Sequence, residues 1–168
     1  LVDQLLDLSR LESGAVPMAA DVVDLAGVVD DVAVAARMAD ATRAAKLRVH
    51  TTSVAVRGDA DRLRQVVTNL VDNALRHSPD GTDVQIDVDR HGANAVVTVS
   101  DAGPGIAPED RERVFERFAR GDRARSSFDG GAGLGLAIVQ WIVDQHHGAI
   151  RVETADPHAP PDRVGCRM

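Results

Sequence analysis

The chain has 168 residues, 44% of them hydrophobic and 27% charged, which is ordinary for one soluble globular domain with a real core. A net charge of −7 and a pI near 5.3 argue against binding to a nucleic-acid backbone, which depends on clustered Lys and Arg. A single cysteine, Cys166, excludes an internal disulfide and a multi-cysteine metal site, and neither a membrane-spanning apolar run nor a signal peptide is visible.

The N-terminal part of the chain predicts two helices and two strands. Residues 1–12 carry leucines at helical spacing and resemble the end of a helix that begins without a cap. Residues 16–23 predict a weak strand, and the Ala- and Val-rich residues 24–46 predict a helix. Residues 47–52 predict a short β-branched strand.

The stretch LRQVVTNLVDNALRH, residues 63–77, predicts an amphipathic helix around which the rest of the chain is arranged. Its apolar residues fall in one arc of the helix, whereas Gln65, Asn69, Asn73, Arg76 and His77 lie on the other side. An N-cap at Asp59 and a stop at residues 79–81 bound the helix.

The polar arc of this helix indicates a candidate ligand site. Asn69 and Asn73 place two neutral oxygen ligands one turn apart, which suits a hard cation such as Mg²⁺ when phosphates supply further ligands. Arg76 would then lie beside those phosphates as a counter-charge. Taken alone, the same arc is also consistent with a solvated polar face.

The second half of the chain predicts strands at residues 84–89 and 95–100, followed by Asp101 at a strand end. A short helix from Pro108, a Gly- and Arg-rich loop over residues 119–133, a helix over residues 134–147 and a last strand over residues 150–154 follow. Because strands and helices interleave without a regular βαβ repeat, we expect an α/β two-layer sandwich.

Three familiar chemistries are excluded by particular residues. The only lysine, Lys46, follows an alanine, so there is no phosphate-binding loop ending in Gly-Lys-Ser/Thr. The cluster from Gly131 has leucine where the dinucleotide fingerprint requires its third glycine, and it follows a loop. His146 and His147 lack partners with metal-ligand spacing, so we expect them to be structural residues at a helix end.

Four motifs in order carry a close family resemblance. The segments NLVDNALRHSPDG, DAGPGI, FERFARGD and GAGLGLAIV resemble the N, G1, F and G2 boxes of the catalytic ATP-binding domain of bacterial two-component sensor histidine kinases. The residues 1–14 resemble the end of the second helix of that family's dimerisation and phosphotransfer hairpin. The expected organisation is therefore a hairpin end at 1–14, a catalytic domain at 15–156 and an atypical Pro-rich tail at 157–168.

The resemblance implies a Bergerat-type fold, in which a mixed sheet is backed by three helices and ATP is bound with Mg²⁺. It implies that Asn73 is the Mg²⁺ ligand and that Asn69, Asn73 and Arg120 are catalytic. The nucleotide-binding positions that it implies are Asn69, Asn73, Arg76, His77, Asp101, Gly103, Gly105, Ile106, Phe115, Phe118, Arg120, Gly131, Gly133, Leu134, Gly135 and Leu136. His77 stands where the family more often has tyrosine.

The chemistry of these residues fits the implied roles. Asp101 can accept a hydrogen bond from the adenine amine, and Gly103 and Gly105 allow the backbone to approach the base, although Asp-Ala-Gly-Pro-Gly could also be a simple turn. Gly131, Gly133 and Gly135 would free backbone N–H groups for phosphate at a helix start. Phe115 and Phe118 would anchor the ATP lid or serve only as core.

The sequence departs from the family pattern at two places. None of the six histidines lies in the motif of the family's phosphoacceptor, so we expect the acceptor, the sensor and the membrane spans to lie upstream of a cytoplasmic fragment. Residues 162–168 do not resemble the family's final strand, so a sheet edge would be unpaired or paired by something unseen. The implied partners are the hairpin of its own homodimeric kinase and a response regulator.

Two other functions compete with this hypothesis. A hydrolytic ATPase of the same superfamily would place glutamate where Asn69 stands, because hydrolysis needs a base to activate water. A non-catalytic nucleotide-binding or docking module is the second alternative. Mg²⁺-dependent ATP binding followed by phosphoryl transfer distinguishes the three.

Overall fold

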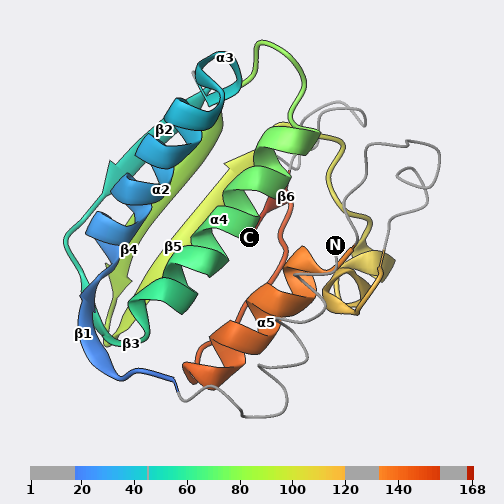
Figure 1. The fold of residues 1–168 in the computed structure, drawn as a ribbon. Coiled ribbons are helices and arrows are strands. Elements are labelled where there is room, and N and C mark those ends of the chain that lie inside the picture. The colour runs from blue at the N-terminus through green and yellow to red at the C-terminus, as the bar shows by residue number, and fades with distance from the viewer. Residues whose placement is uncertain (1–17, 45, 120–132, 156–165) are drawn as a thin grey trace.

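The computed structural model describes residues 18–44, 46–119, 133–155 and 166–168 of the chain. Three main helices lie on one face of a β-sheet (Figure 1). The elements in chain order are β1 (Asp21–Asp24), α2 (Leu25–Ala39), α3 (Ala41–Ala44), β2 (Leu47–Thr51), β3 (Ala55–Gly58), α4 (Ala60–His77), β4 (Val84–His91), β5 (Asn94–Asp101), the 3-10 helices η1 (Pro108–Asp110) and η2 (Arg113–Phe115), α5 (Gly135–Gln145) and β6 (Cys166–Arg167).

The main sheet has four strands in the order β2-β4-β5-β6. β2 and β4 run parallel, whereas β4 with β5 and β5 with β6 are antiparallel. β1 and β3 form a separate antiparallel pair. The structure therefore confirms the predicted two-layer α/β sandwich with a mixed sheet backed by three helices, α2, α4 and α5.

The hydrophobic core lies between the helices and one face of the sheet. In β4, Val84, Ile86 and Val88 are buried and alternate with more exposed polar residues, as the period of two predicts. Val67 and Val71 of α4 pack into the same cluster. Burying one such side chain contributes roughly 1.5–3 kcal/mol, so this layer holds α4 and its polar arc in place on the sheet.

The N-cap of α4 is the residue that the sequence predicted, and the helix ends at His77, just before the stop predicted at residues 79–81. The Asp59 side chain accepts hydrogen bonds from the N–H groups of Asp61 and Arg62 at 3.1 Å each, which confirms it as the N-cap. At the other end, the N–H of Ser78 donates to the Ala74 carbonyl oxygen and closes the helix. The polar arc of α4 therefore ends at His77.

His146 ties the end of α5 to the start of α4. The Asp59 N–H donates to Nε2 of His146 at 3.0 Å, and the Nδ1 atom lies 2.8 Å from the Ile142 carbonyl oxygen. Because Nε2 accepts, Nδ1 must be the protonated nitrogen that donates. A Cβ atom at Gly58 would lie 2.6 Å from the imidazole Cδ2, so the glycine makes room for this contact. The prediction of a structural role is confirmed for His146.

The N-terminal elements differ from the predicted ones. Within the described residues the first strand is β1 at 21–24, and its partner β3 was not predicted from the sequence. The predicted helix over 24–46 is interrupted at Asp40, which adopts an extended backbone with φ −150° and ψ 92°. Asp24 precedes α2 and caps it by accepting the Ala26 N–H at 3.2 Å.

The predictions for the C-terminal edge of the sheet were also wrong. Residues 150–154 form no strand and contain one isolated bridge residue, Glu153. The edge of β5 is paired instead by β6, with Asp101 opposite Cys166. Met168 continues this pairing through two backbone hydrogen bonds with Val99, of 2.8 and 3.0 Å. Residues 166–168 thus occupy the edge that was expected to be unpaired or paired by something unseen.

Candidate functional site

The polar arc of α4 faces the end of β5. Asn69 and Asn73 are half-buried, whereas Arg76 and His77 are exposed at the helix end. Asn73 and Asp101 line one small cavity, and its other walls are Leu70, Ala74, Val99 and Met168. The fold therefore brings together the first two motifs that sequence analysis singled out.

Asp101 is held at the edge of this cavity by the turn that follows it. The Gly103 N–H donates to Asp101 Oδ1 at 2.7 Å. A Cβ atom at position 103 would lie 2.8 Å from that oxygen and 2.8 Å from the His77 carbonyl oxygen, so only glycine fits. Gly105 has a φ of 69°, which glycine adopts without strain. The turn is thus packed directly against the end of α4.

Two titratable groups near the cavity have shifted pKa values. Burial raises the pKa of the Asp101 carboxyl above its usual value, although backbone N–H groups of Gly103 and Cys166 oppose the shift. Partial burial, and then the neighbouring Arg76, lower the pKa of the His77 imidazole, although much of its surface is exposed. Asp101 therefore offers acceptor oxygens and His77 a neutral ring.

The start of α5 approaches Asn69. A Cβ atom at Gly135 would lie 3.3 Å from Asn69 Oδ1, which is closer than most real contacts. Leu134, just before the helix, is completely buried. The first N–H groups of an α-helix have no partner within the helix and carry partial positive charge, so this end suits an anion. The fourth motif therefore adjoins the first.

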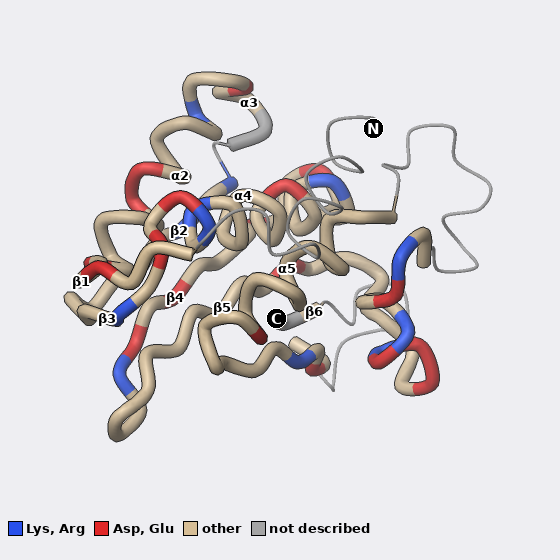
Figure 2. Tube along the Cα trace, turned by 60° about the horizontal axis from the view of Figure 1, so that its bottom comes forward, with Lys and Arg blue, Asp and Glu red and all other residues tan. Residues whose placement is uncertain are grey.

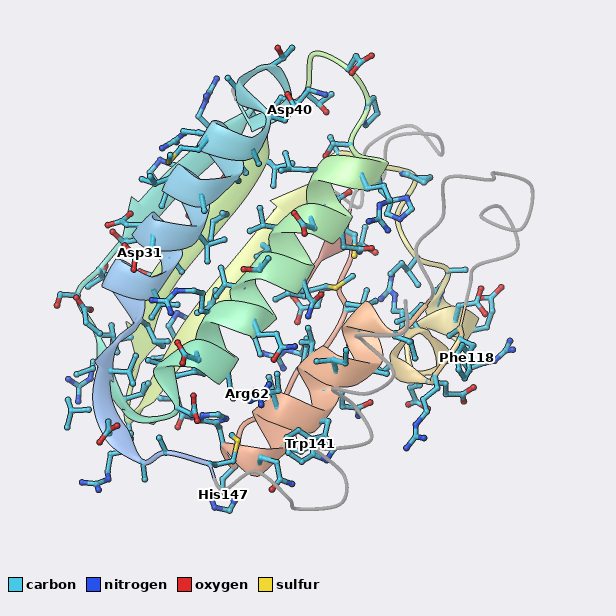
Figure 3. All side chains as sticks on the ribbon, in the orientation of Figure 1. Asp31, Asp40, Arg62, Phe118, Trp141 and His147 are labelled. Atoms are coloured by element: carbon cyan, nitrogen blue, oxygen red, sulfur yellow. The ribbon has the colours of Figure 1, made fainter. Side chains whose placement is uncertain are left out.

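Phe118 and Gly133 are described residues on either side of residues 120–132, which lie outside the described part of the chain. The Phe118 N–H donates to the Gly133 carbonyl oxygen at 2.9 Å, so the two positions are held together. Gly133 has a φ of 69°, and a Cβ atom there would lie 2.9 Å from the Phe118 carbonyl carbon. Phe118 itself is 58% exposed and lies at the outer edge of the η1–η2 segment (Figure 3).

A second, smaller hydrophobic cluster lies next to the site. Phe115 is buried there with Val152 and Cys166, and Ile106 and Leu136 pack against them. Burial, and then the nearby Asp101, raise the pKa of Cys166 to about 12, so the thiol stays protonated and unreactive. Phe115 thus has a packing role in the described structure.

Some predicted site residues are not described, and some lining residues were not predicted. Arg120 and Gly131 lie outside the described residues. The sequence reasoning missed Leu70, Ala74, Val99 and Met168 as cavity walls. The first two belong to the apolar arc of α4 and could have been found as the residues flanking Asn73, whereas Met168 had no sequence signal because the tail was not expected to pair.

A second hollow opens on the other side of Asn69. It is an open cavity of about 300 Å³ between α4 and α5, lined by Asp61, Arg64, Gln65, Thr68, Asn69 and Ile138. Its rim is polar, and Arg64 is paired there with Asp61 at 3.0 Å. Asn69 is therefore shared between this hollow and the start of α5.

The donors present fit a nucleotide with a hard cation better than a protein-only metal centre. Within the described ranges, no cluster of three or more His, Cys, Asp or Glu side chains could hold a metal ion. The Asn69 and Asn73 amides are the kind of neutral oxygen donors that Mg²⁺ uses when phosphates complete its shell. Basic and acidic residues are interspersed along the part of the chain drawn in colour, without a basic stripe (Figure 2).

Comparisons with known proteins agree with this geometry. The family described as Histidine kinase-, DNA gyrase B-, and HSP90-like ATPase matches residues 58–167. The chain is 44% identical over 154 residues to the sensor-like histidine kinase SenX3 of Mycobacterium tuberculosis, covering 90% of this chain and 37% of that protein. The chain thus spans little more than a third of the length of this curated relative.

Solved structures show the same similarity. The mycobacterial sensor histidine kinase MprB superposes with a TM-score of 0.77 at 36% identity, covering 89% of this chain and 93% of that one. Full-length ShkA in complex with AMPPNP also gives 0.77, at 26% identity, covering 99% of this chain and 33% of that one.

The chain therefore belongs to the histidine kinase-, DNA gyrase B- and HSP90-like ATPase family. Within that family it is a catalytic ATP-binding domain of the two-component sensor histidine kinase type. Among the described residues, no helix is both long enough and apolar enough to cross a bilayer.

Proposed function

We propose that this domain binds ATP with Mg²⁺ and donates the γ-phosphoryl group to a histidine on the phosphotransfer hairpin of its own kinase. One observation carries the proposal: Asn73 and Asp101 line the same cavity, while Asn69, one turn away, faces the first residue of α5. A base acceptor, a cation ligand and a helix start are thereby aligned along α4. In one bound nucleotide, the base would lie at Asp101, the Mg²⁺ ion at Asn73 and the phosphates at the start of α5.

Each described residue has a distinct role in the proposal. Asp101 would orient the base by accepting a hydrogen bond from its exocyclic amine, and Gly103 keeps the turn close to α4. Asn73 would hold Mg²⁺, which supplies neutralisation of charge on the phosphate oxygens when bound. Asn69, Arg76 and the N–H groups at the start of α5 would face the phosphates. Arg120 is proposed as a further phosphate contact from the family motif.

The wider context of the domain is also part of the proposal. Residues 1–14 would be the end of the hairpin's second helix, and the catalytic domain would extend over 15–156. The partners would be the hairpin of a homodimeric kinase and a response regulator, and the domain would act on the cytoplasmic side of a membrane-anchored protein. The similarity to SenX3 and MprB, both described as sensor histidine kinases, supports this context.

The site disfavours one of the two competing functions. Asn69 is an amide that faces Gly135, and an amide cannot take the proton of an attacking water, which disfavours a hydrolytic ATPase. A non-catalytic nucleotide-binding module would use the same base acceptor and the same cation ligand to bind ATP with Mg²⁺. It is distinguished from the proposal by the transfer reaction itself.

The first test is binding. The isolated chain should bind a fluorescent ATP analogue saturably, unlabelled ATP should displace it, and chelation of Mg²⁺ should weaken the competition. Competition by ATP reports on the base and phosphates together, whereas competition by adenosine reports on the base cavity alone. Failure to observe saturable binding by the folded chain would refute the proposed function.

A further inference from the structure

Met168 lines the candidate nucleotide site together with Asn73 and Asp101. Its backbone N–H donates to the Val99 carbonyl oxygen at 3.0 Å, and its carbonyl oxygen accepts the Val99 N–H at 2.8 Å. Cys166 lies opposite Asp101 in the same register. Because alternate residues of a strand share a face, Met168 and Cys166 project from the same side of this edge, next to Val99 and Asp101.

The cavity beside Asp101 is very small. Its volume is about 10 Å³, room for no more than about one water molecule, and Met168 is one of its walls. The remaining walls are the apolar Leu70, Ala74 and Val99 together with Asn73 and Asp101. A group attached to the amine of a base held by Asp101 would point into this small apolar space, where no polar partner other than Asn73 is available.

We propose that Met168 is the back wall of the base pocket and determines specificity, because it excludes substituents on the exocyclic amine of adenine. This inference rests on the proposed function, since it needs the base to be held by Asp101. Leu70 and Ala74 belong to the buried face of α4, and Val99 to a central strand, so these walls are fixed by the core. Met168 is only half-buried and lies at a sheet edge. The length of its side chain therefore sets the size of the cavity on that side.

Shortening Met168 tests the inference directly. Met168→Ala removes the Cγ, Sδ and Cε atoms and should open the hole behind Asp101. We expect N6-benzyl-ATP to compete weakly with a fluorescent ATP analogue on the unmodified chain and on the order of tenfold better on Met168→Ala, which is the value of a few buried carbon atoms in an apolar pocket. ATP itself should compete with both within about threefold, because its amine contacts Asp101 and not the wall.

Matched variants separate the loss of bulk at position 168 from effects of truncating a methionine elsewhere. Met168→Leu keeps the bulk and should retain the discrimination, and Met38→Ala makes the same truncation at a residue that is 84% exposed on α2 and should change nothing. Circular dichroism verifies folding of each variant. If Met168→Ala does not fold, Met168→Val carries the same test with a smaller hole.

The outcomes distinguish this inference from the function on which it rests. An unmodified chain that fails to bind ATP would refute the proposed function. ATP binding with an unchanged ratio of N6-benzyl-ATP to ATP affinity in the folded, shortened variant would overturn only the role of Met168. An equal gain in Met38→Ala would also overturn it, because the effect would then not depend on the cavity.

Discussion

Replacing Asp101 with asparagine is expected to weaken ATP binding on the order of 100-fold, the cost of leaving a buried donor without an acceptor. The carboxylate already accepts the Gly103 N–H at 2.7 Å and has capacity for the amine of a base. An asparagine side chain has one oxygen, so its NH₂ group would face either Gly103 or the amine. Competition titrations of the variant and the unmodified chain measure the difference.

Asp89→Asn is the matched control for this change. Asp89 is exposed and lies near the other end of the sheet, where it bonds Thr52, so the same loss of charge should leave ATP affinity unchanged. Guanine carries an acceptor where adenine carries its amine, so the preference for ATP over GTP should narrow in Asp101→Asn. Equal affinity of the variant and the unmodified chain for ATP would show that Asp101 does not hold the base.

The pKa of Asp101 gives this prediction a pH dependence. Burial raises the folded-state pKa, so the carboxyl takes up a proton at a higher pH than an ordinary aspartate and loses acceptor capacity. The ratio of unmodified to Asp101→Asn affinity should therefore decline as the pH falls through the raised pKa. Ionisation of ATP itself affects both affinities equally, because both proteins bind the same ligand, so it does not change the ratio.

The same shift has the opposite sign for stability. Because the folded pKa exceeds the unfolded one, the stability that protonation of Asp101 contributes is present in full below the unfolded pKa. It is lost as the pH rises through the folded pKa. Acid should therefore weaken the base contact at Asp101 while this one group favours the fold.

Asn73→Ala is expected to abolish the Mg²⁺-dependent part of ATP binding and to leave the fold intact. Asn73 is half-buried at the cavity and contributes no apolar surface to the core of α4, so its loss removes an oxygen ligand with little effect on packing. ATP affinity should fall on the order of tenfold or more in Mg²⁺ and become insensitive to chelation. Titrations with and without Mg²⁺ measure this dependence.

The control for Asn73 is Asn94→Ala at the exposed first residue of β5. It removes the same amide away from the site and should preserve the effect of Mg²⁺. Loss of helical circular dichroism in Asn73→Ala would show that Asn73 is structural. Retention of the full Mg²⁺ effect in the folded variant would exclude Asn73 as the cation ligand.

Local patterns predicted the central elements of the fold. The apolar arc and the N-cap of α4 agree with the sequence prediction, because Asp59 acts on backbone N–H groups within one turn of it. The alternation in β4 is equally local. The α4 site residues followed from the same periodicity, since an arc that is not buried must face either solvent or a ligand.

Elements that depend on distant partners were not predictable in this way. β3 is a strand because it pairs with β1, more than thirty residues earlier, and its own pattern is weak. β6 is a strand because the edge of β5 accepts it, so residues 150–154, with the stronger β pattern, were mistaken for the last strand. Met168 was missed as a site residue for the same reason.

The central claim, that this domain is the phosphoryl donor of a sensor histidine kinase, is tested most directly by transfer. The chain should be incubated with radiolabelled ATP, Mg²⁺ and a separately supplied phosphotransfer hairpin of its parent kinase. We predict acid-labile, base-stable label on the hairpin histidine and none on the chain, appearing slowly because the linkage that raises local concentration is absent. Label on the chain itself, which would make one of its six histidines an acceptor, or an unlabelled hairpin despite saturable ATP binding, would contradict the account.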